Sequence, residues 1–368
     1  MKLLQQPESG ATPLIDGINH ARSSIDILIF RFEHPEIEKA LANAVSRGVS
    51  VQALIAHVNG SGEESLRRLE MRLLAAGVTV ARTSGGLVRY HAKLMVIDRC
   101  ELYLLAFNFT RLDIKRSRSF GIVTKDPKLV REALKLVEAD AKRQPYEPGL
   151  ATFVVSPENA RKELSAFIKG AEHELLIYDP KVSDDTMIHL LEERARADVD
   201  VKVIGQVSPA SSWFSVRRLI SPRLHTRVMI RDRQAAFIGS QSLREMELDR
   251  RREAGIVLND AAIVNQLAKT FQEDWSLSKP LKLDAVKRPA TPPLARVAKR
   301  VAKEFAKGLP PVSPMLEVTI KEMVGERPEL ALDAAQVEET VRDAVKGAVK
   351  EALREMVEEA EQNHGLRA

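Results

Sequence analysis

The stretches HAKLMVID (residues 91–98) and HTRVMIRD (residues 225–232) are two copies of one pattern, and they lie in different halves of the chain. In both copies an aspartate ends the pattern, and a small polar residue, Asn108 or Ser242, lies ten positions further on. Each copy offers an imidazole, a cation and an amide or hydroxyl group, which together suit a phosphate better than a metal ion. The repetition predicts one active site that is assembled from two half-sites.

The repeat extends well beyond these two stretches. Apolar residues before the first copy recur 150 positions later, and from the histidines onward the spacing is 134, through Gly121-Ile122-Val123 and Gly255-Ile256-Val257. The pairs separated by 150 positions are Ile18 and Ile168, Ala21 and Ala171, Ile25 and Leu175, Leu41 and Leu191, Val49 and Val199, and Val51 and Val201. A constant spacing on both sides of the motif indicates an internal duplication.

Both copies resemble the signature of the phospholipase D superfamily, which runs His-x-Lys-x4-Asp and continues, six residues on, with Gly-Gly/Ser-x-Asn. The signature is matched by His91, Lys93, Asp98 and Asn108 in the first copy, and by His225, Asp232, Gly239 and Ser240 in the second. Leu105-Ala106 replaces the glycine pair of the first copy, whereas Arg227 and Ser242 replace the lysine and the asparagine of the second. The resemblance covers roughly residues 10 to 280.

This resemblance implies an α/β fold of two sandwich halves with mixed sheets, which pack together about a pseudo-two-fold axis with the site at the seam. Apolar periodicity agrees, because it predicts a strand over 25–30, a helix over 35–47 and a strand over 49–55, and the same order restarts at Pro157. The expected division of the chain is a first half over 1–148, a second half over 149–281, and a linker with an α-helical C-terminal extension over 282–368.

The resemblance also implies a reaction in which one histidine attacks phosphorus to give a phosphohistidine. The other histidine protonates the leaving group and then activates water or an alcohol, so that no metal and no cofactor are expected. The expected catalytic residues are His91, His225, Lys93 and Arg227, and the expected phosphate-binding or orienting residues are Asn108, Ser242, Ser240 and Glu253. Asp98 and Asp232 are expected to make structural hydrogen bonds. A metal site is not expected, because the lysine would repel a cation.

One position distinguishes the two half-sites. In the superfamily a carboxylate about 28 residues after the motif histidine orients its ring, and this position is Glu253 after His225 but Ser119 after His91. The resemblance therefore implies that Glu253 orients His225 and fixes its tautomer. His91 has the more complete set of phosphate-binding residues, and the sequence leaves open which histidine attacks.

Composition bounds the partners and the compartment. The net charge of +5 favours anionic partners, and phospholipid head groups and nucleic acid fit it equally. Aromatic residues are only 5% of the chain, so anionic phospholipids are favoured over choline lipids, which need an aromatic cage. The single cysteine, Cys100, fits a reducing compartment. Because the N-terminus has neither a secretory signal nor a membrane span, we expect a cytoplasmic protein, with peripheral contact at the inner membrane surface as an alternative.

Three further segments have two interpretations each. The loop 208–218, with Trp213 and Phe214, is either a lid over the site or a plug of the seam between the halves. The sequence predicts a basic amphipathic helix over 294–307, which either lies on an anionic membrane or docks on its own catalytic domain. It also predicts a long charged helix over 333–362, which either pairs in a homodimer, or packs on the body of the protein or is partly frayed in solvent.

Three functions follow from these observations. The first is a metal-independent phosphodiesterase or phosphatidyltransferase that acts on phospholipids of the kind handled by cardiolipin synthases. The second is a nuclease that uses the same histidine pair. The third is a non-catalytic module that binds phosphate or nucleic acid, which the substitutions in the second copy suggest.

Overall fold

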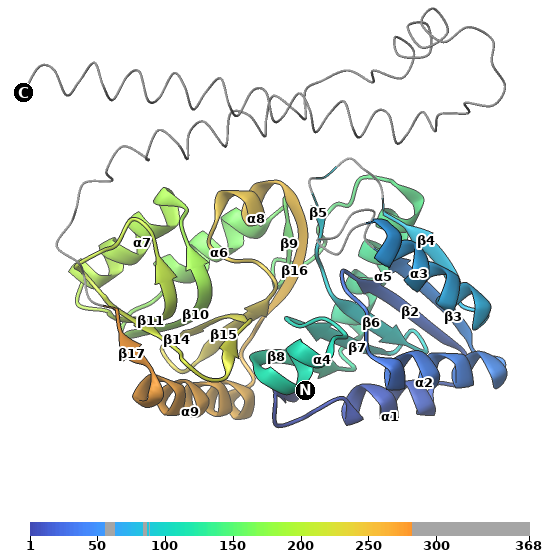
Figure 1. Ribbon diagram of the computed structural model, residues 1–368. Coiled ribbons are helices and arrows are strands. Elements are labelled where there is room, and N and C mark those ends of the chain that lie inside the picture. The colour runs from blue at the N-terminus through green and yellow to red at the C-terminus, as the bar shows by residue number, and fades with distance from the viewer. Residues whose placement is uncertain (56–62, 84–86, 88, 282–368) are drawn as a thin grey trace, which may run out of the picture. The chain divides into compact units, whose positions relative to one another are not determined.

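The computed structural model describes residues 1–55, 63–83, 87 and 89–281 (Figure 1). Met1–Lys282 forms one compact unit. The amphipathic helix expected over 294–307 and the dimer helix expected over 333–362 lie outside the described residues. Among the described residues, no helix has the length and apolar character needed to cross a membrane.

The first half of the chain forms a mixed sheet. Its strands, in spatial order, are β1 (Lys2–Gln6), β8 (Ser117–Thr124), β7 (Glu101–Leu105), β6 (Leu94–Ile97), β2 (Ser24–Ile29), β3 (Ser50–Ile55) and β4 (Thr79–Arg82). The strands β2, β3 and β4 are parallel, whereas β1, β8, β7, β6 and β2 pair with one another in antiparallel fashion. The helices of this half are α1 (Thr12–His20), α2 (Pro35–Ser46), α3 (Glu63–Ala75), α4 (Arg111–Arg116) and α5 (Pro127–Lys142).

The second half repeats this arrangement. Its sheet contains, in spatial order, β17 (Lys279–Pro280), β12 (Ser215–Arg218), β11 (Asp200–Val207), β10 (Glu174–Val182), β14 (Arg227–Arg231), β15 (Ala235–Gly239), β16 (Arg251–Leu258) and β5 (Arg89–Tyr90), with β9 (Phe153–Ser156) also on β16. Its helices are α6 (Ala160–Lys169), α7 (Asp185–Arg196), α8 (Glu245–Asp249) and α9 (Ala261–Leu277). The predicted two-part α/β architecture with mixed sheets is therefore confirmed.

Each half lends a short strand to the sheet of the other. The strand β5 comes from the first half but pairs with β16, as Figure 1 shows, and β13 (Arg223–Leu224) comes from the second half but pairs with β8. The motif histidines come directly after these two short strands, and their backbone N–H groups also bond to the opposite half. The His91 N–H donates to the Arg252 carbonyl at 2.7 Å, and the His225 N–H donates to the Arg118 carbonyl at 3.1 Å. Both histidines are thus fixed to the opposite half.

Apolar side chains fill three regions, one between the halves and one on the outer side of each sheet. The sequence of strand β6 is an unbroken apolar run because both faces of the strand are buried. Leu94 and Val96 pack into the shared core together with residues of β14, β15 and β16, whereas Met95 and Ile97 pack into the outer core of the first half. The shared core makes the two halves one folding unit, because neither sheet could bury its inner face alone.

The two motif aspartates lie in the tight turns that connect the strands of a hairpin, β6 to β7 and β14 to β15. Asp98 has φ of 51° and Asp232 has φ of 52°, and the next residue in each case is also left-handed. The Asp98 carboxylate accepts backbone N–H groups of Arg22, Ser23 and Ser24, and Asp232 accepts those of residues 172–174. Each aspartate therefore ties the hairpin that begins with the motif strand to the start of the neighbouring antiparallel strand, β2 in the first half and β10 in the second.

Candidate active site

The two motif histidines line one pocket of about 340 Å³. Its walls are formed by Phe30, Arg31, Glu33, His91, Asn108, Thr110, Arg111, Leu112, Asp113, Arg223 and His225. A second pocket of about 520 Å³ shares Glu33 but contains neither histidine, and its other lining residues lie on or beside α2 and α3. The smaller pocket is the candidate site, because it alone among the described pockets brings both imidazoles to one cavity.

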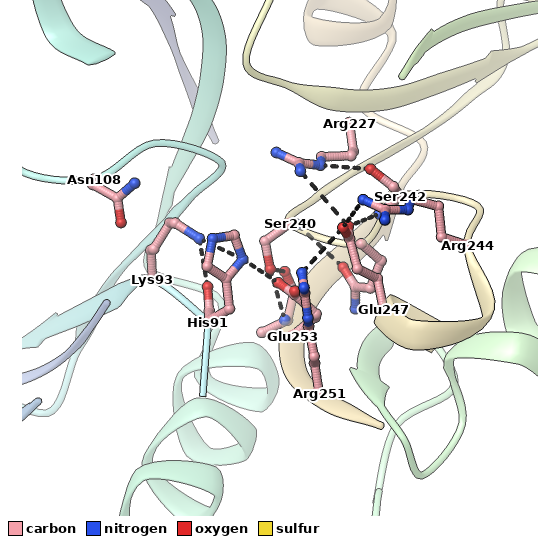
Figure 2. A network of polar contacts seen from close by, with 12 residues as sticks. His91, Lys93, Asn108, Arg227, Ser240, Ser242, Arg244, Glu247, Arg251 and Glu253 are labelled. Atoms are coloured by element: carbon pink, nitrogen blue, oxygen red, sulfur yellow. Dashed lines mark hydrogen bonds and ion pairs between the residues drawn. The ribbon is translucent and has the colours of Figure 1, made fainter. Parts of the chain in front are cut away.

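His91 is held by a carboxylate from the other half. Its Nδ1 lies 2.8 Å from the Glu253 Oε2, and Glu253 is fully buried (Figure 2). Lys93 places its Nζ 3.0 Å from the same Nδ1 and donates to the His91 carbonyl oxygen. One nitrogen cannot both donate to a carboxylate and accept from an ammonium group, and the shorter pairing with Glu253 assigns the proton to Nδ1. The Nε2 of His91 is then left with a free lone pair.

This contact corrects the pairing that the sequence implied. Glu253 was expected to orient His225, which is 28 residues before it, but it lies against His91. The physical reason is the strand exchange, since Glu253 lies on β16, whose neighbour β5 leads directly into His91. The residue at the equivalent position of the first half, Ser119, accordingly contacts the opposite histidine and donates its hydroxyl to the His225 carbonyl at 3.0 Å.

His225 has a different carboxylate, which the sequence analysis missed. Its Nδ1 lies 3.4 Å from the Asp113 Oδ2. Asp113 also accepts the Asn108 backbone N–H at 3.0 Å and the Asn108 Nδ2 at 2.8 Å, and it forms an ion pair with Arg223. One signal could have identified it, because Asp113 and Glu247 are separated by 134 positions, the same spacing as the two histidines. Both copies therefore carry an acidic residue at this place.

Glu247 organises the cations of the second half-site (Figure 2). Its Oε2 lies 3.6 Å from Arg227 Nη2 and accepts the Ser242 backbone N–H at 2.8 Å, while its Oε1 lies 3.2 Å from both Arg244 and Arg251. Arg227 also donates its Nε to the Ser242 hydroxyl at 3.0 Å. The arginine that replaces the motif lysine is therefore fixed in place by the serine that replaces the motif asparagine.

The other residues predicted for the site are engaged in hydrogen bonds within the protein or lie outside the lining of the pocket. Asn108 lines the pocket, but both ends of its amide are engaged, because its Oδ1 accepts the Arg31 backbone N–H at 3.2 Å and its Nδ2 donates to Asp113. Ser240 accepts the Ala254 backbone N–H at 3.2 Å and so holds β15 against the strand that carries Glu253. Lys93, Arg227 and Ser242 are buried and are not among the residues that line the pocket.

Burial and charge together set the protonation of the site. Burial lowers the pKa of His91 well below its ordinary value, and the positive charges of Lys93 and Arg227 lower it further. Burial likewise lowers the pKa of His225 well below its ordinary value, and the Asp113 carboxylate only partly opposes this. Burial also lowers the pKa of Lys93 to about 7 and raises that of Glu253. Both histidines are therefore neutral at pH 7 in the free protein.

Several buried polar atoms at the seam have no hydrogen-bond partner among the described residues. They include Arg227 Nη1, His225 Nδ1 and Glu253 Oε1, which all lie at or next to the candidate site. Most buried polar groups in folded proteins are hydrogen-bonded, and an unsatisfied one costs about 1–3 kcal/mol. Unsatisfied donors on a buried arginine, beside two neutral histidines, are the arrangement expected of a site that completes its hydrogen bonds with an oxyanion.

The loop with adjacent aromatic residues does not belong to this site. Phe214 is buried in the outer core of the second half, and Trp213 is exposed with the Arg196 guanidinium 4.5 Å from its ring centre. Neither ring lines the pocket that holds the histidines. The two interpretations of this loop, a lid over the site and a plug of the seam, are therefore both wrong.

Comparison with known proteins identifies a domain family that matches both halves and relatives that match part of the chain. The domain family described as "Cardiolipin synthase, PLD-like domain" matches residues 14–141 and 164–275. The mitochondrial cardiolipin hydrolase of Danio rerio is 29% identical over 134 residues, which are 34% of this chain and 56% of that protein. The human mitochondrial cardiolipin hydrolase is 27% identical over 154 residues, 41% of this chain and 57% of that protein. The chain thus matches a little over half the length of these relatives.

Solved structures agree in fold. A polyphosphate kinase from Porphyromonas gingivalis superposes with a TM-score of 0.63 at 18% identity, covering 74% of this chain and 50% of the kinase. A phosphatidylserine synthase from Haemophilus influenzae superposes with a TM-score of 0.60 at 12% identity, covering 76% of this chain and 87% of the synthase. At such low identities the two superpositions show a shared architecture of two repeated halves and leave the chemistry to the site itself.

Proposed function

Because this chain belongs to the phospholipase D superfamily, we propose that it is a phosphodiesterase whose catalytic pair is His91 and His225. The observation that carries this proposal is that both imidazoles line one pocket and each has a carboxylate from the opposite half at its Nδ1. A carboxylate on Nδ1 fixes the tautomer and directs Nε2 at the substrate, as in other histidine-dependent enzymes.

His91 is the nucleophile in this proposal. Its contact with Glu253 is the shorter of the two, and its low pKa keeps the ring neutral, as a nucleophile requires. In the first step the His91 Nε2 forms a bond to phosphorus while the bond from phosphorus to the leaving oxygen breaks. His225 gives its Nε2 proton to that oxygen. The products of this step are an alcohol and a phosphohistidine.

The second step returns both histidines to their starting states. His225, now neutral, removes a proton from water, and the water oxygen bonds to phosphorus as the bond to His91 breaks. The product is a phosphomonoester. If an alcohol takes the place of water, the same step transfers the phosphatidyl group, so hydrolysis and transfer differ only in the acceptor that reaches the pocket.

The cations explain how His225 acquires the proton that the first step needs. In the free protein Lys93 and Arg227 oppose a positive charge on His225, and Asp113 favours it. A bound phosphodiester anion offsets the two cations, so it raises the pKa of His225 and of Lys93 together. The site therefore becomes protonated as substrate binds, and Lys93 and Arg227 stabilise the negative charge that builds up on the phosphoryl oxygens.

The substrate that we propose is an anionic phospholipid. Support comes from the matched family, described as a cardiolipin synthase domain, and from relatives named as cardiolipin hydrolases. Apart from the two imidazoles, the only aromatic ring among the described residues that line the pocket is that of Phe30, which packs edge-on against His91 with ring centres 4.7 Å apart. Such a wall provides neither a stacking platform for bases nor a cage for choline.

The test compares substrates and traps the intermediate. The purified protein is incubated with vesicles of cardiolipin or phosphatidylglycerol and, separately, with single-stranded DNA, in the absence of divalent metal. We expect lipid turnover, its loss in His91→Ala with the fold retained, and acid-labile phosphate on His91. Cleavage of DNA alone would assign a nuclease. Binding of phosphodiesters without turnover of any of them would leave only a binding module and refute the proposal.

A further inference from the structure

The short helix α4 forms part of the mouth of the pocket and carries an unusual surface. Thr110 caps its first turn by accepting the Asp113 N–H at 3.1 Å, and Asp113 and Ile114 point into the protein. The residues that face outward are Arg111, Leu112, Lys115 and Arg116. Leu112 is 49% exposed, and both it and Arg111 line the pocket, so this surface is continuous with the candidate active site.

The three cations of this surface are Arg111, Lys115 and Arg116. Arg111, Lys115 and Arg116 make no hydrogen bond and no ion pair with any residue that the structure describes. They lie at spacings of one, four and five residues, which places them on one face of the helix around Leu112. Exposure of a leucine side chain to water is unfavourable. A leucine surrounded by cations is complementary to a lipid surface, which presents anionic head groups at its boundary and hydrocarbon below them.

The duplicated helix α8 provides an internal comparison. It occupies the equivalent place in the second half, but its charges are paired, with Glu245 3.8 Å from Arg250, and Asp249 bonded to Arg161. Its Glu247 is buried among arginines of the site. The two half-sites therefore share a fold but differ in the surface they present, and only α4 combines unpaired positive charge with an exposed apolar side chain.

We propose that α4 docks on the surface of an anionic lipid bilayer and so brings a head-group phosphodiester to the pocket. This inference rests on the proposed function and extends it from the chemistry of one phosphate to the way the substrate is presented. Arg111, Lys115 and Arg116 contact lipid phosphates, and Leu112 inserts at the level of the upper acyl chains. A bilayer is favoured over a nucleic acid because the described residues at the mouth offer an exposed aliphatic side chain, Leu112, and no exposed phenylalanine, tyrosine or tryptophan ring on which a base could stack.

The experiment uses the full chain and two substitutions that lie outside the lining of the pocket, Lys115→Gln and Arg116→Gln. Binding to vesicles of phosphatidylglycerol and phosphatidylcholine is measured by co-sedimentation, and turnover is measured on a soluble short-chain phosphodiester. A cation near an anionic bilayer contributes roughly five-fold in affinity, so we expect the double variant to bind about 25-fold more weakly. Turnover of the soluble diester should stay within about two-fold, because the histidines are unchanged.

The duplication supplies a matched control. Arg250 lies 134 positions after Arg116 and is exposed directly after the equivalent helix α8, so Arg250→Gln should leave vesicle binding within about two-fold. In contrast, Arg116→Gln alone should weaken it about five-fold. Pure phosphatidylcholine vesicles should bind poorly to every form.

The outcomes separate this inference from the proposed function. If the double variant binds anionic vesicles as well as the unaltered protein while the soluble diester is still cleaved, docking through α4 is refuted and the phosphodiesterase stands. If the unaltered protein cleaves no diester, the proposed function fails, and the vesicle measurement still decides on docking. If the unaltered protein does not bind vesicles but binds single-stranded DNA, and the double variant no longer binds this DNA, the partner is an anionic polymer and the inference is overturned.

Discussion

Asp113→Asn is the substitution that tests the proposed division of labour between the two histidines. Asp113 is 4% exposed, lies 3.4 Å from His225 Nδ1 and makes no hydrogen bond or ion pair with His91. Burial by itself would raise the pKa of Asp113, but His225, the Asn108 amide and Arg223 outweigh burial and lower it. The carboxylate is therefore ionised at pH 7, and the substitution removes a full negative charge from beside His225 while keeping nearly the same shape.

The size of the effect follows from the geometry. In the free protein the His225 Nδ1 lies 3.4 Å from the Asp113 Oδ2 and makes no hydrogen bond to it. Catalytic hydrogen bonds often form only once substrate is bound, and one to a charged group contributes about 1.5–3 kcal/mol, or about 10- to 150-fold in rate. Because the contact is long in the free protein, we expect the lower end, a decrease of about 10-fold in kcat. Because Asp113 raises the pKa of His225, its loss also lowers that pKa, and the alkaline limb of the kcat profile should move to lower pH.

The assay varies the leaving group. In a series of methyl aryl phosphodiesters, a phenol of low pKa departs as the anion without a proton, whereas a phenol of high pKa needs a general acid. If His225 is that acid, Asp113→Asn should slow the poor leaving groups about 10-fold and the best ones less than about three-fold, so that kcat depends more steeply on leaving-group pKa. Trapping of phosphate on His91 should persist with the good leaving groups.

Glu247→Gln is the matched control, since Glu247 is the duplicated counterpart of Asp113 but lies against Arg227 and not against a histidine. It should weaken substrate binding and raise KM, and leave the leaving-group dependence unchanged. An Asp113→Asn protein whose rates fall equally for every leaving group would refute the role of His225 as the general acid. A phosphohistidine found at His225 would do the same and would exchange the two roles.

Three other predictions concern charge and burial. Burial lowers the pKa of Lys93 to about 7, so sulfate should bind more weakly as pH rises through 7. The variant Lys93→Arg stays charged and should remove this pH dependence. The prediction is contradicted if calorimetric titration shows the same pH dependence of sulfate binding in both proteins. His34 is 2% exposed with neither ring nitrogen hydrogen-bonded, and burial lowers its pKa, so the folded state excludes a proton that the unfolded state takes up below about pH 6.5. Stability is therefore lost as pH falls below that value, and His34→Phe should reduce the slope by up to about 1.4 kcal/mol per pH unit in urea unfolding; an unchanged slope would exclude this source. Arg252→Met leaves the buried Asp140 without its cation and should cost about 3–5 kcal/mol of unfolding free energy, most of which Asp140→Asn in the same protein should restore; additive losses in the two substitutions would show that the pair is not coupled.

Much of the fold could be predicted because its signals are local or repeated. Apolar periodicity marked the strand over 25–30 and the helix over 35–47, which the structure places at Ser24–Ile29 and Pro35–Ser46. A periodic pattern depends only on which faces of an element are buried, so it is visible without knowledge of the partners. The constant spacings of 150 and 134 positions then required two similar halves, because independent sequences do not keep register over such lengths.

The sequence by itself determined that this protein has two repeated halves, and it predicted a site with two motif histidines and two motif cations, Lys93 and Arg227. Only the tertiary structure decided which carboxylate contacts the Nδ1 of which histidine. Glu253 lies 28 positions from His225 along the chain but contacts His91, and Asp113 reaches His225 from the other half. The physical reason is that β5 of the first half pairs with β16 of the second, and β13 of the second half pairs with β8 of the first. Such pairing between the halves depends on backbone hydrogen bonds and shared core packing, which residue spacing along the chain does not reveal.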